Sequence, residues 1–132
     1  MSIENQRNKA LAAEYLAVCD AAPVDGLVQA TSRYLSLDVI WQGFKPLTCT
    51  NGPEALVAQY LAPLRRAFPK LERITHILIG GRSDGTAKGG DDGRAWVGAM
   101  GYLDGEQGSA VWGIPSRPGI RRLRWSEFME FD

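Results

Sequence analysis

Histidine and cysteine are scarce in this sequence, which has one histidine and two cysteines among its 132 residues. His76 has no second histidine with which to share a metal ion. Cys19 and Cys49 match no spacing of metal ligands, so no metal site is evident. Two isolated cysteines without a secretion signal are expected to be free thiols. We therefore expect no metal and no other cofactor.

Long apolar runs and net charge are also lacking. No apolar stretch approaches the roughly 20 residues of a membrane span, and residues 1–9 lack the apolar centre of a signal peptide. A cytoplasmic protein without membrane contact is the expectation. Lys plus Arg and Asp plus Glu number 15 each, so the net charge is zero and no overall field attracts nucleic acid. Four arginines, Arg117, Arg121, Arg122 and Arg124, are interpreted as a solvated, partly ion-paired face; a phosphate groove is the alternative.

The spacing of apolar residues predicts a mixed α and β architecture. A chain of 132 residues has about the modal size of one domain. Helical periodicity predicts helices near 8–18, 24–35 and 53–64, the last with a kink or an end at Pro63, and β-rich or alternating stretches predict strands near 38–41, 47–50, 71–79, 94–103 and 123–131. Residues 80–93 are expected to be a flexible connection. This order predicts an α+β domain in which helices pack on one face of a cone-shaped, curved antiparallel sheet.

The predicted strand 71–79 contains the single histidine. Strict alternation divides it into two faces: Leu71, Arg73, Thr75, Ile77 and Ile79 on one, and Glu72, Ile74, His76 and Leu78 on the other. His76 is a candidate catalytic group or hydrogen-bond donor if its face is concave. A half-exposed position on the outer face is the alternative.

The last predicted strand carries an unusual carboxyl group. Alternation places Glu127 on one face with Leu123, Trp125, Met129 and Phe131. Apolar neighbours disfavour the charged form of a carboxyl, which raises its pKa and suits it for proton transfer near neutral pH. Glu127 is therefore the principal catalytic candidate. An edge position, with Glu127 solvated or paired with an arginine, remains open.

Aromatic side chains are numerous enough to line a hydrophobic pocket at the wide end of such a cone. The predicted substrate-binding residues are Trp41, Tyr60, Trp96, Tyr102, Trp112, Arg124, Trp125 and Met129. Core packing is the alternative for each aromatic residue taken singly. The expected ligand is a small hydrophobic molecule.

Several motifs accompany this order of elements. They are Trp41, Gly52, the run from Pro63 to Arg73, Gly101 with Gly105, Gly113-Ile114-Pro115, and the run from Leu123 to Phe128. Together they resemble the SnoaL-like polyketide-cyclase branch of the nuclear-transport-factor-2-like superfamily over most of the chain. The resemblance implies a cone-shaped α+β barrel, with residues 1–132 as a single SnoaL-like domain.

The resemblance also implies an activity. Glu127 matches the acidic residue that acts as acid and base on a carbonyl-activated carbon in the cyclases, where the residue is aspartate. Leu103 stands where those cyclases tend to carry a histidine. The expected function is that of a cyclase, isomerase or dehydratase (lyase) acting on a hydrophobic carbonyl or polyketide-like substrate. A non-catalytic ligand-binding or dimerisation domain of the same fold is the alternative.

Two further expectations depend on the same resemblance. Relatives continue beyond the position of Asp132 into one more strand, so we expect this sequence to be a fragment that lacks the final strand. The convex side of the sheet commonly pairs in this superfamily, which implies a homodimer.

Overall fold

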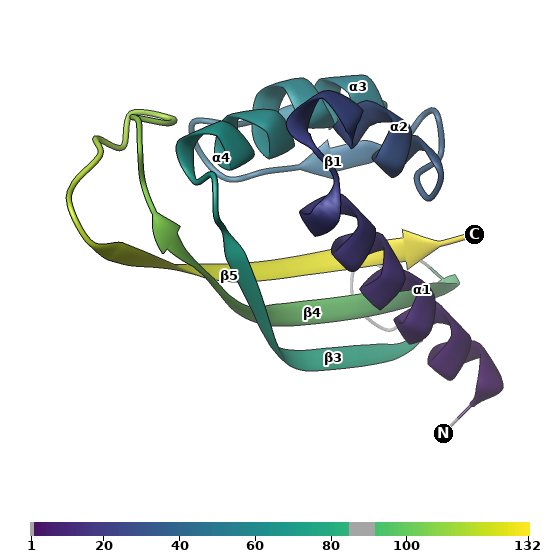
Figure 1. Ribbon diagram of the computed structural model, residues 1–132. Coiled ribbons are helices and arrows are strands. Elements are labelled where there is room, and N and C mark those ends of the chain that lie inside the picture. The colour runs from purple at the N-terminus through teal and green to yellow at the C-terminus, as the bar shows by residue number, and fades with distance from the viewer. Residues whose placement is uncertain (1, 85–91) are drawn as a thin grey trace.

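The computed structural model describes residues 2–84 and 92–132 and has an α+β fold (Figure 1). The helical elements are α1 (Ile3–Ala21), η1 (Val24–Gly26), α2 (Leu27–Ser32), α3 (Pro53–Leu56), η2 (Val57–Leu61) and α4 (Ala62–Ala67). The strands are β1 (Ile40–Gln42), β2 (Cys49–Asn51), β3 (Glu72–Asp84), β4 (Asp92–Glu106) and β5 (Ile120–Phe131). Helices pack on one face of an antiparallel sheet of order β3-β4-β5, and β1 and β2 form a separate antiparallel pair.

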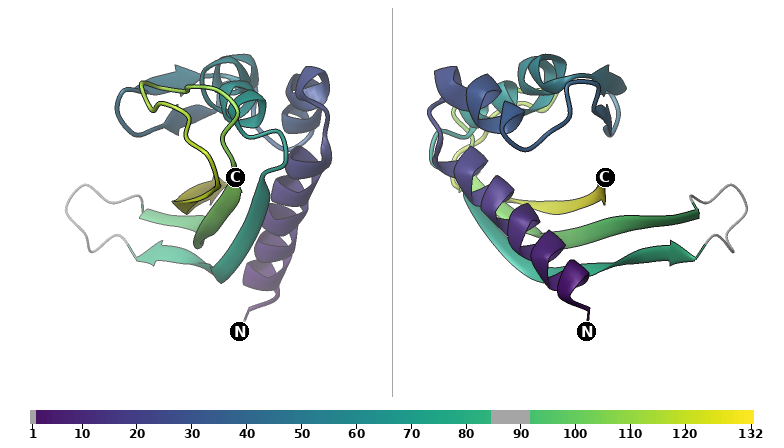
Figure 2. Two further views of the ribbon diagram at one scale, coloured as in Figure 1. Left: turned by 60° about the vertical axis from the view of Figure 1, so that its left-hand side comes forward. Right: turned by 90° about the vertical axis from the view of Figure 1, so that its right-hand side faces the viewer.

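The sheet curves but does not close. Among the described residues it has three strands, with β3 and β5 at its edges, which is too few strands to complete a barrel. The predicted α+β architecture is confirmed, whereas the closed α+β barrel is corrected to an open sheet. The two views of Figure 2 show α1 crossing beside the sheet and the other helices lying over one face. The opposite face, which we call the outer face, carries no helix formed by the described residues.

Helix α1 is longer than predicted because both of its ends are capped. At the start, the Ser2 hydroxyl oxygen accepts a hydrogen bond from the Asn5 N–H at 3.0 Å. At the end, Arg65 donates to the carbonyls of Cys19 and Ala22, each at 2.7 Å. The buried residues of α1, Ala12, Tyr15, Leu16 and Cys19, recur at helical spacing and form the side that packs on the sheet.

The expected kink at Pro63 is a π-helical turn. Residues 53–67 form one helical run, in which η2 lies between α3 and α4 and is π-helical. Pro63 has no N–H to offer the carbonyl of Gln59, four residues earlier. The indole N–H of Trp112 donates to that carbonyl instead, at 3.1 Å. The irregular turn therefore fixes Trp112 beside Tyr60, which lies in the same turn.

A β-bulge at His76 changes which residues of β3 face the helices. The pairing with β4 shifts between Thr75 and Ile77, so His76 is an extra residue. Before the bulge Arg73 pairs with Leu103, and after it Leu78 pairs with Ala99, both on the inner face. The predicted alternation is therefore wrong beyond His76: Ile77 and Ile79 lie on the outer face, and Leu78 packs against the core.

The connection between β3 and β4 is shorter than predicted. The strands continue through Asp84 and begin again at Asp92, because the glycines at 80, 81 and 93 are accommodated within them. The rest of the predicted flexible segment, residues 85–91, lies outside the described residues.

Candidate functional site

Glu127 lies on the inner face of β5, opposite Ala99 of β4 and next to Trp125 and Met129 along the same face. The residue is half-buried. Burial raises the pKa of its carboxyl group; the positive charge of Arg73 opposes this rise and the negative charge of Asp20 adds to it. The direction predicted for its pKa is confirmed, but its environment is not wholly apolar, because the charges of Arg73 and Asp20 also act on it. Its catalytic role remains a prediction.

The Glu127 carboxyl group has no hydrogen bond and no ion pair among the residues that the structure describes. Arg73 is the cation whose charge acts on Glu127, but its side chain is bonded to another carboxyl group. Its Nε and Nη2 donate to Asp20 at 2.7 and 3.0 Å. A carboxyl without such bonds keeps both of its oxygens available to another molecule.

Arg73 is nearly enclosed, with 11% of its side chain exposed. Its Cζ atom lies 4.3 Å from the centre of the Trp125 ring, a cation–π contact. Burial acts to lower the pKa of Arg73, but the hydrogen bonds and charge of Asp20 outweigh it and raise the pKa overall. The guanidinium therefore stays charged, although its Nη1 atom is buried without a hydrogen-bond partner among the described residues.

Three weakly acidic groups also lie within the electrostatic reach of Glu127. Burial raises the pKa of Tyr15 and of Tyr60, and the charge of Glu127 raises both further. Burial raises the pKa of the Cys19 thiol to about 11. All three groups remain protonated at neutral pH and can act only as neutral donors or acceptors.

Tyr60 connects this group of residues to an aromatic cluster. Its ring stacks on Trp41 at 4.6 Å and on Trp112 at 5.6 Å between ring centres. Phe44 meets Trp112 and Tyr60 edge-on at 5.3 and 6.2 Å. Three of the predicted pocket aromatics, Trp41, Tyr60 and Trp112, are thus brought together.

Four predicted site residues lie on the wrong face of the sheet. His76, Trp96, Tyr102 and Arg124 are on the outer face, opposite to Glu127. His76 is exposed, and its ring meets the Tyr102 ring edge-on at 5.4 Å. Side chains on opposite faces of one sheet cannot line a common pocket. The structure thus corrects the assignment of these four residues to the site of Glu127.

Two predicted binding residues, Trp125 and Met129, lie on the same face of the sheet as Glu127. Trp125 is buried with 4% exposed, and Met129 is half-buried against the core, both on the face of Glu127. The sequence analysis missed Asp20, Arg73 and Tyr15. Arg73 could have been found by the argument that found Glu127, since it was the one charged residue on its predicted strand face. Nothing in the sequence places Asp20, because its role depends on how α1 packs against β3.

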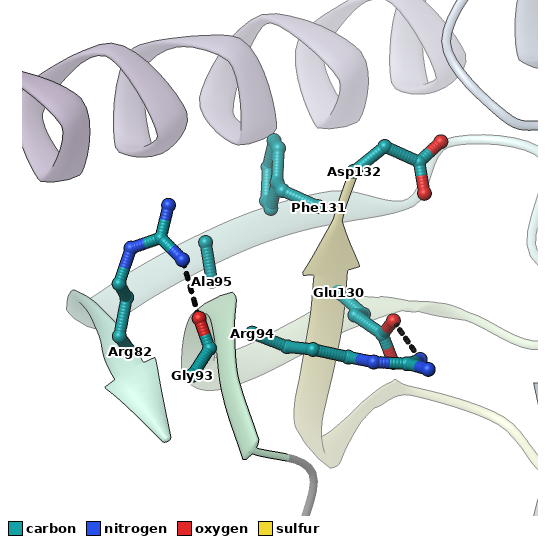
Figure 3. Close-up of a pocket in the computed structure, with 7 residues that line it drawn as sticks. All are labelled: Arg82, Gly93, Arg94, Ala95, Glu130, Phe131 and Asp132. Carbon is teal, nitrogen blue, oxygen red and sulfur yellow. Dashed lines mark hydrogen bonds and ion pairs between the residues drawn. The ribbon is translucent and has the colours of Figure 1, made fainter. Parts of the chain in front are cut away.

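Glu127 lines neither of two pockets that lie on the surface of the described residues. The first, of about 330 Å³, lies at one end of the sheet and is lined by Arg82, Gly93, Arg94, Ala95, Glu130, Phe131 and Asp132. In Figure 3, Arg94 pairs with Glu130 and Arg82 donates to the carbonyl of Gly93, so its charges are largely satisfied within the chain. The second, of about 280 Å³, lies between α1 and β3, where Asp20 and Arg73 form part of its lining.

Other signs of function are few. Within residues 2–84 and 92–132, no group of three or more His, Cys, Asp or Glu side chains is placed to hold a metal ion. No helix in the described part of the chain is long and apolar enough to cross a membrane. Comparisons with protein-family models, with curated proteins and with solved structures found no match. The function is therefore argued from the site alone.

Proposed function

We propose that this chain is a cytoplasmic small-molecule enzyme of the SnoaL-like type, within the nuclear-transport-factor-2-like superfamily, in which Glu127 transfers a proton. The observation that supports it is the state of the Glu127 carboxyl: half-buried, raised in pKa and without a hydrogen bond in the described structure. A structural carboxylate in such a place would normally be paired.

The reaction best suited to this group is proton abstraction next to a carbonyl. The ionised Glu127 takes a proton from the carbon, the electron pair moves to the carbonyl oxygen, and the proton is then returned to carbon or oxygen. Isomerisation, ring closure or loss of water can follow from the same enolate. The neutral hydroxyl of Tyr60 is the proposed donor to the enolate oxygen, because its raised pKa keeps it protonated.

The charges around Glu127 favour an uncharged substrate. Arg73 and Asp20 form a bidentate pair and neutralise each other. The remaining neighbours are aromatic or aliphatic side chains, including Trp125, Met129 and the rings that stack on Tyr60. The charge of Arg73 is already offset by Asp20, so an anionic ligand would gain little there, whereas an apolar ketone would lose little hydration on binding.

The test is exchange of carbon-bound hydrogen in heavy water. We expect the protein to accelerate deuterium incorporation beside the carbonyl of 2-tetralone, an uncharged bicyclic ketone, as followed by proton NMR. Glu127→Gln should lower the accelerated rate by about 10²- to 10⁴-fold, the usual contribution of a general base. Glu130→Gln is the matched control, because Glu130 lies on the same strand but pairs with Arg94 on the outer face. Equal rates for the wild type and Glu127→Gln would refute the acid–base role.

A second candidate is a non-catalytic ligand-binding or dimerisation domain. It is favoured by the two pockets, neither of which includes Glu127. In that case Glu127 would tune ligand affinity or stability only. The exchange experiment separates the candidates, since a binding domain would retain 2-tetralone without exchanging its hydrogens.

We also propose that two copies of this chain associate through the outer face. Its exposed apolar side chains include Ile77, Ile79, Met100 and Phe128, with 45%, 56%, 37% and 66% of each exposed. Its ion pairs, Arg122 with Asp104 and Arg94 with Glu130, are completed within one chain. A second copy, also without net charge, would meet little repulsion there.

A further inference from the structure

Arg73 acts electrostatically on two carboxyl groups, those of Asp20 and Glu127, and bonds to only one of them. Its guanidinium donates two hydrogen bonds to Asp20 and none to Glu127 among the described residues, although its charge acts on both. Its third nitrogen, Nη1, is buried without a hydrogen-bond partner in the described part of the chain. The two N–H groups on Nη1, out of the five that a guanidinium carries, are therefore unused while a carboxyl without a hydrogen bond lies within its electrostatic reach.

The structure holds the guanidinium in this place from two sides. Trp125 lies against it at 4.3 Å from the ring centre, and Trp125 is two residues before Glu127 on the same face of β5. Asp20 lies in the last turn of α1, between Cys19 and Ala22, whose carbonyls are both bound by Arg65. The end of the helix that carries Asp20 is thus anchored to α4 and is not free to follow the guanidinium.

A carboxylate at this place on α1 requires a local reason. The C-terminal end of a helix carries partial negative charge, so an aspartate in the last turn is unfavourable without a cation. The bidentate pair with Arg73 supplies that cation with the geometry that arginine and carboxylate prefer. The pair therefore explains why an aspartate is tolerated at position 20, and it also fixes the orientation of the Arg73 side chain.

We propose that Asp20 is a positioning residue that acts through Arg73: by holding the guanidinium in a bidentate pair, it keeps the cation from closing on Glu127 and leaves that carboxyl free to take and release a proton. The proposal rests on the proposed role of Glu127 as the proton-transfer group. It adds a residue that touches neither the substrate nor the transferred proton.

The titratable groups that interact electrostatically with Glu127 make the effect of a change in Asp20 predictable. They are Arg73 from β3, Asp20, Tyr15 and Cys19 from α1, and Tyr60 from η2. The two tyrosines and the cysteine stay neutral, so only Arg73 and Asp20 carry charge. Loss of Asp20 removes a negative neighbour and releases a cation, and both changes favour the ionised form of Glu127.

The experiment is a carbon-13 NMR titration of the Glu127 carboxyl in the whole chain, with Glu127→Gln to assign the signal. Asp20→Asn should lower the apparent pKa of Glu127. The double variant Asp20→Asn with Arg73→Gln should not lower it below the wild-type value, because the released cation is gone. If the double variant shows the same fall as Asp20→Asn alone, Asp20 acts directly and the proposal is wrong.

Glu4→Gln is the matched control, since it breaks the other ion pair between α1 and β3, that of Glu4 with Arg82. It should leave the pKa of Glu127 unchanged.

If Asp20→Asn does not fold, Asp20→Glu is the second variant. It keeps the negative charge but has a side chain one methylene longer, which displaces the guanidinium. The proposal then requires the pKa of Glu127 to move, whereas an effect of charge alone would leave it in place. No substrate is present, so the result is independent of whether 2-tetralone is a substrate.

Discussion

At the scale of single residues, the raised pKa of Glu127 has a consequence for stability that needs no substrate. A carboxyl whose pKa is higher in the folded than in the unfolded chain binds its proton more tightly when folded. Stability therefore falls as the pH rises from about 4.3, the value of a free glutamate, to the folded value, and the loss persists at higher pH. The charged form of Glu127 thus destabilises the fold.

We predict that Glu127→Gln is more stable than the wild type at pH 7–8. The gain in Tm should be roughly 2–5 °C, the change that about 1 kcal/mol produces in a domain of this size. Below pH 4 the difference should vanish, because both proteins are then uncharged at this position. Thermal unfolding followed by circular dichroism at several pH values is the measurement. Glu130→Gln should show no such gain, and a Glu127→Gln protein that loses stability with rising pH relative to the wild type would contradict the buried carboxyl.

The sequence identified Glu127 because alternation along an isolated strand is a local property. One ionisable residue among Trp125, Met129 and their apolar neighbours is visible without any knowledge of the fold. Asp20 was not visible, since its partner Arg73 lies on an element distant in sequence. His76 and Tyr102 were misplaced because alternation states which residues share a face but not which face is covered by helices.

At the scale of elements, the bulge in β3 determines which of its side chains reach the site. Gly101 of β4 lies opposite Thr75, beside the bulge. A Cβ atom added to Gly101 would lie 1.9 Å from the carbonyl oxygen of Ile74, far inside contact distance. The two strands can approach at this point only because residue 101 has no side chain.

We predict that Gly101→Ala destabilises the protein by about 3 kcal/mol or prevents folding, because backbone atoms of β3 must move to admit the methyl group. Gly81→Ala is the control on the other strand, since a Cβ atom there would meet nothing within 4 Å. Urea unfolding of both variants is the measurement. Equal stability of the two would mean that the pairing at the bulge is looser than the register indicates.

The elements themselves were largely predictable, and their irregularities were not. Pro63 predicted an irregularity in its helix. It did not predict a π-helical turn, or that the carbonyl of Gln59 would accept a hydrogen bond from Trp112. Alternation predicted β5 from residue 123 to its end at Phe131, because nothing interrupts the pattern there, although the strand begins earlier, at Ile120. In β3 the same rule failed at His76, since a bulge depends on the partner strand and leaves no mark in the sequence of its own strand.

At the scale of the whole molecule, the two faces of the sheet differ in what covers them. The inner face carries Glu127 and the core, and the helices cover it. The outer face carries Phe128, whose ring lies over Gly98, where an added Cβ atom would approach to 2.7 Å. An aromatic ring fixed on an open sheet face, with apolar neighbours and paired charges around it, is typical of the centre of an interface.

We predict that Phe128→Glu separates the proposed homodimer. Loss of a central aromatic contact and burial of an unpaired charge should raise the Kd by about 30-fold or more, corresponding to about 2 kcal/mol. Leu37→Glu is the control, because Leu37 is 85% exposed and lies outside the sheet. Sedimentation at micromolar concentration should show dimers of the wild type and of Leu37→Glu and monomers of Phe128→Glu. A monomeric wild type would refute the proposed homodimer. A dimeric Phe128→Glu would mean that the interface lies on another surface. Either outcome leaves the chemistry of Glu127 untouched, since that residue faces the opposite side of the same strand.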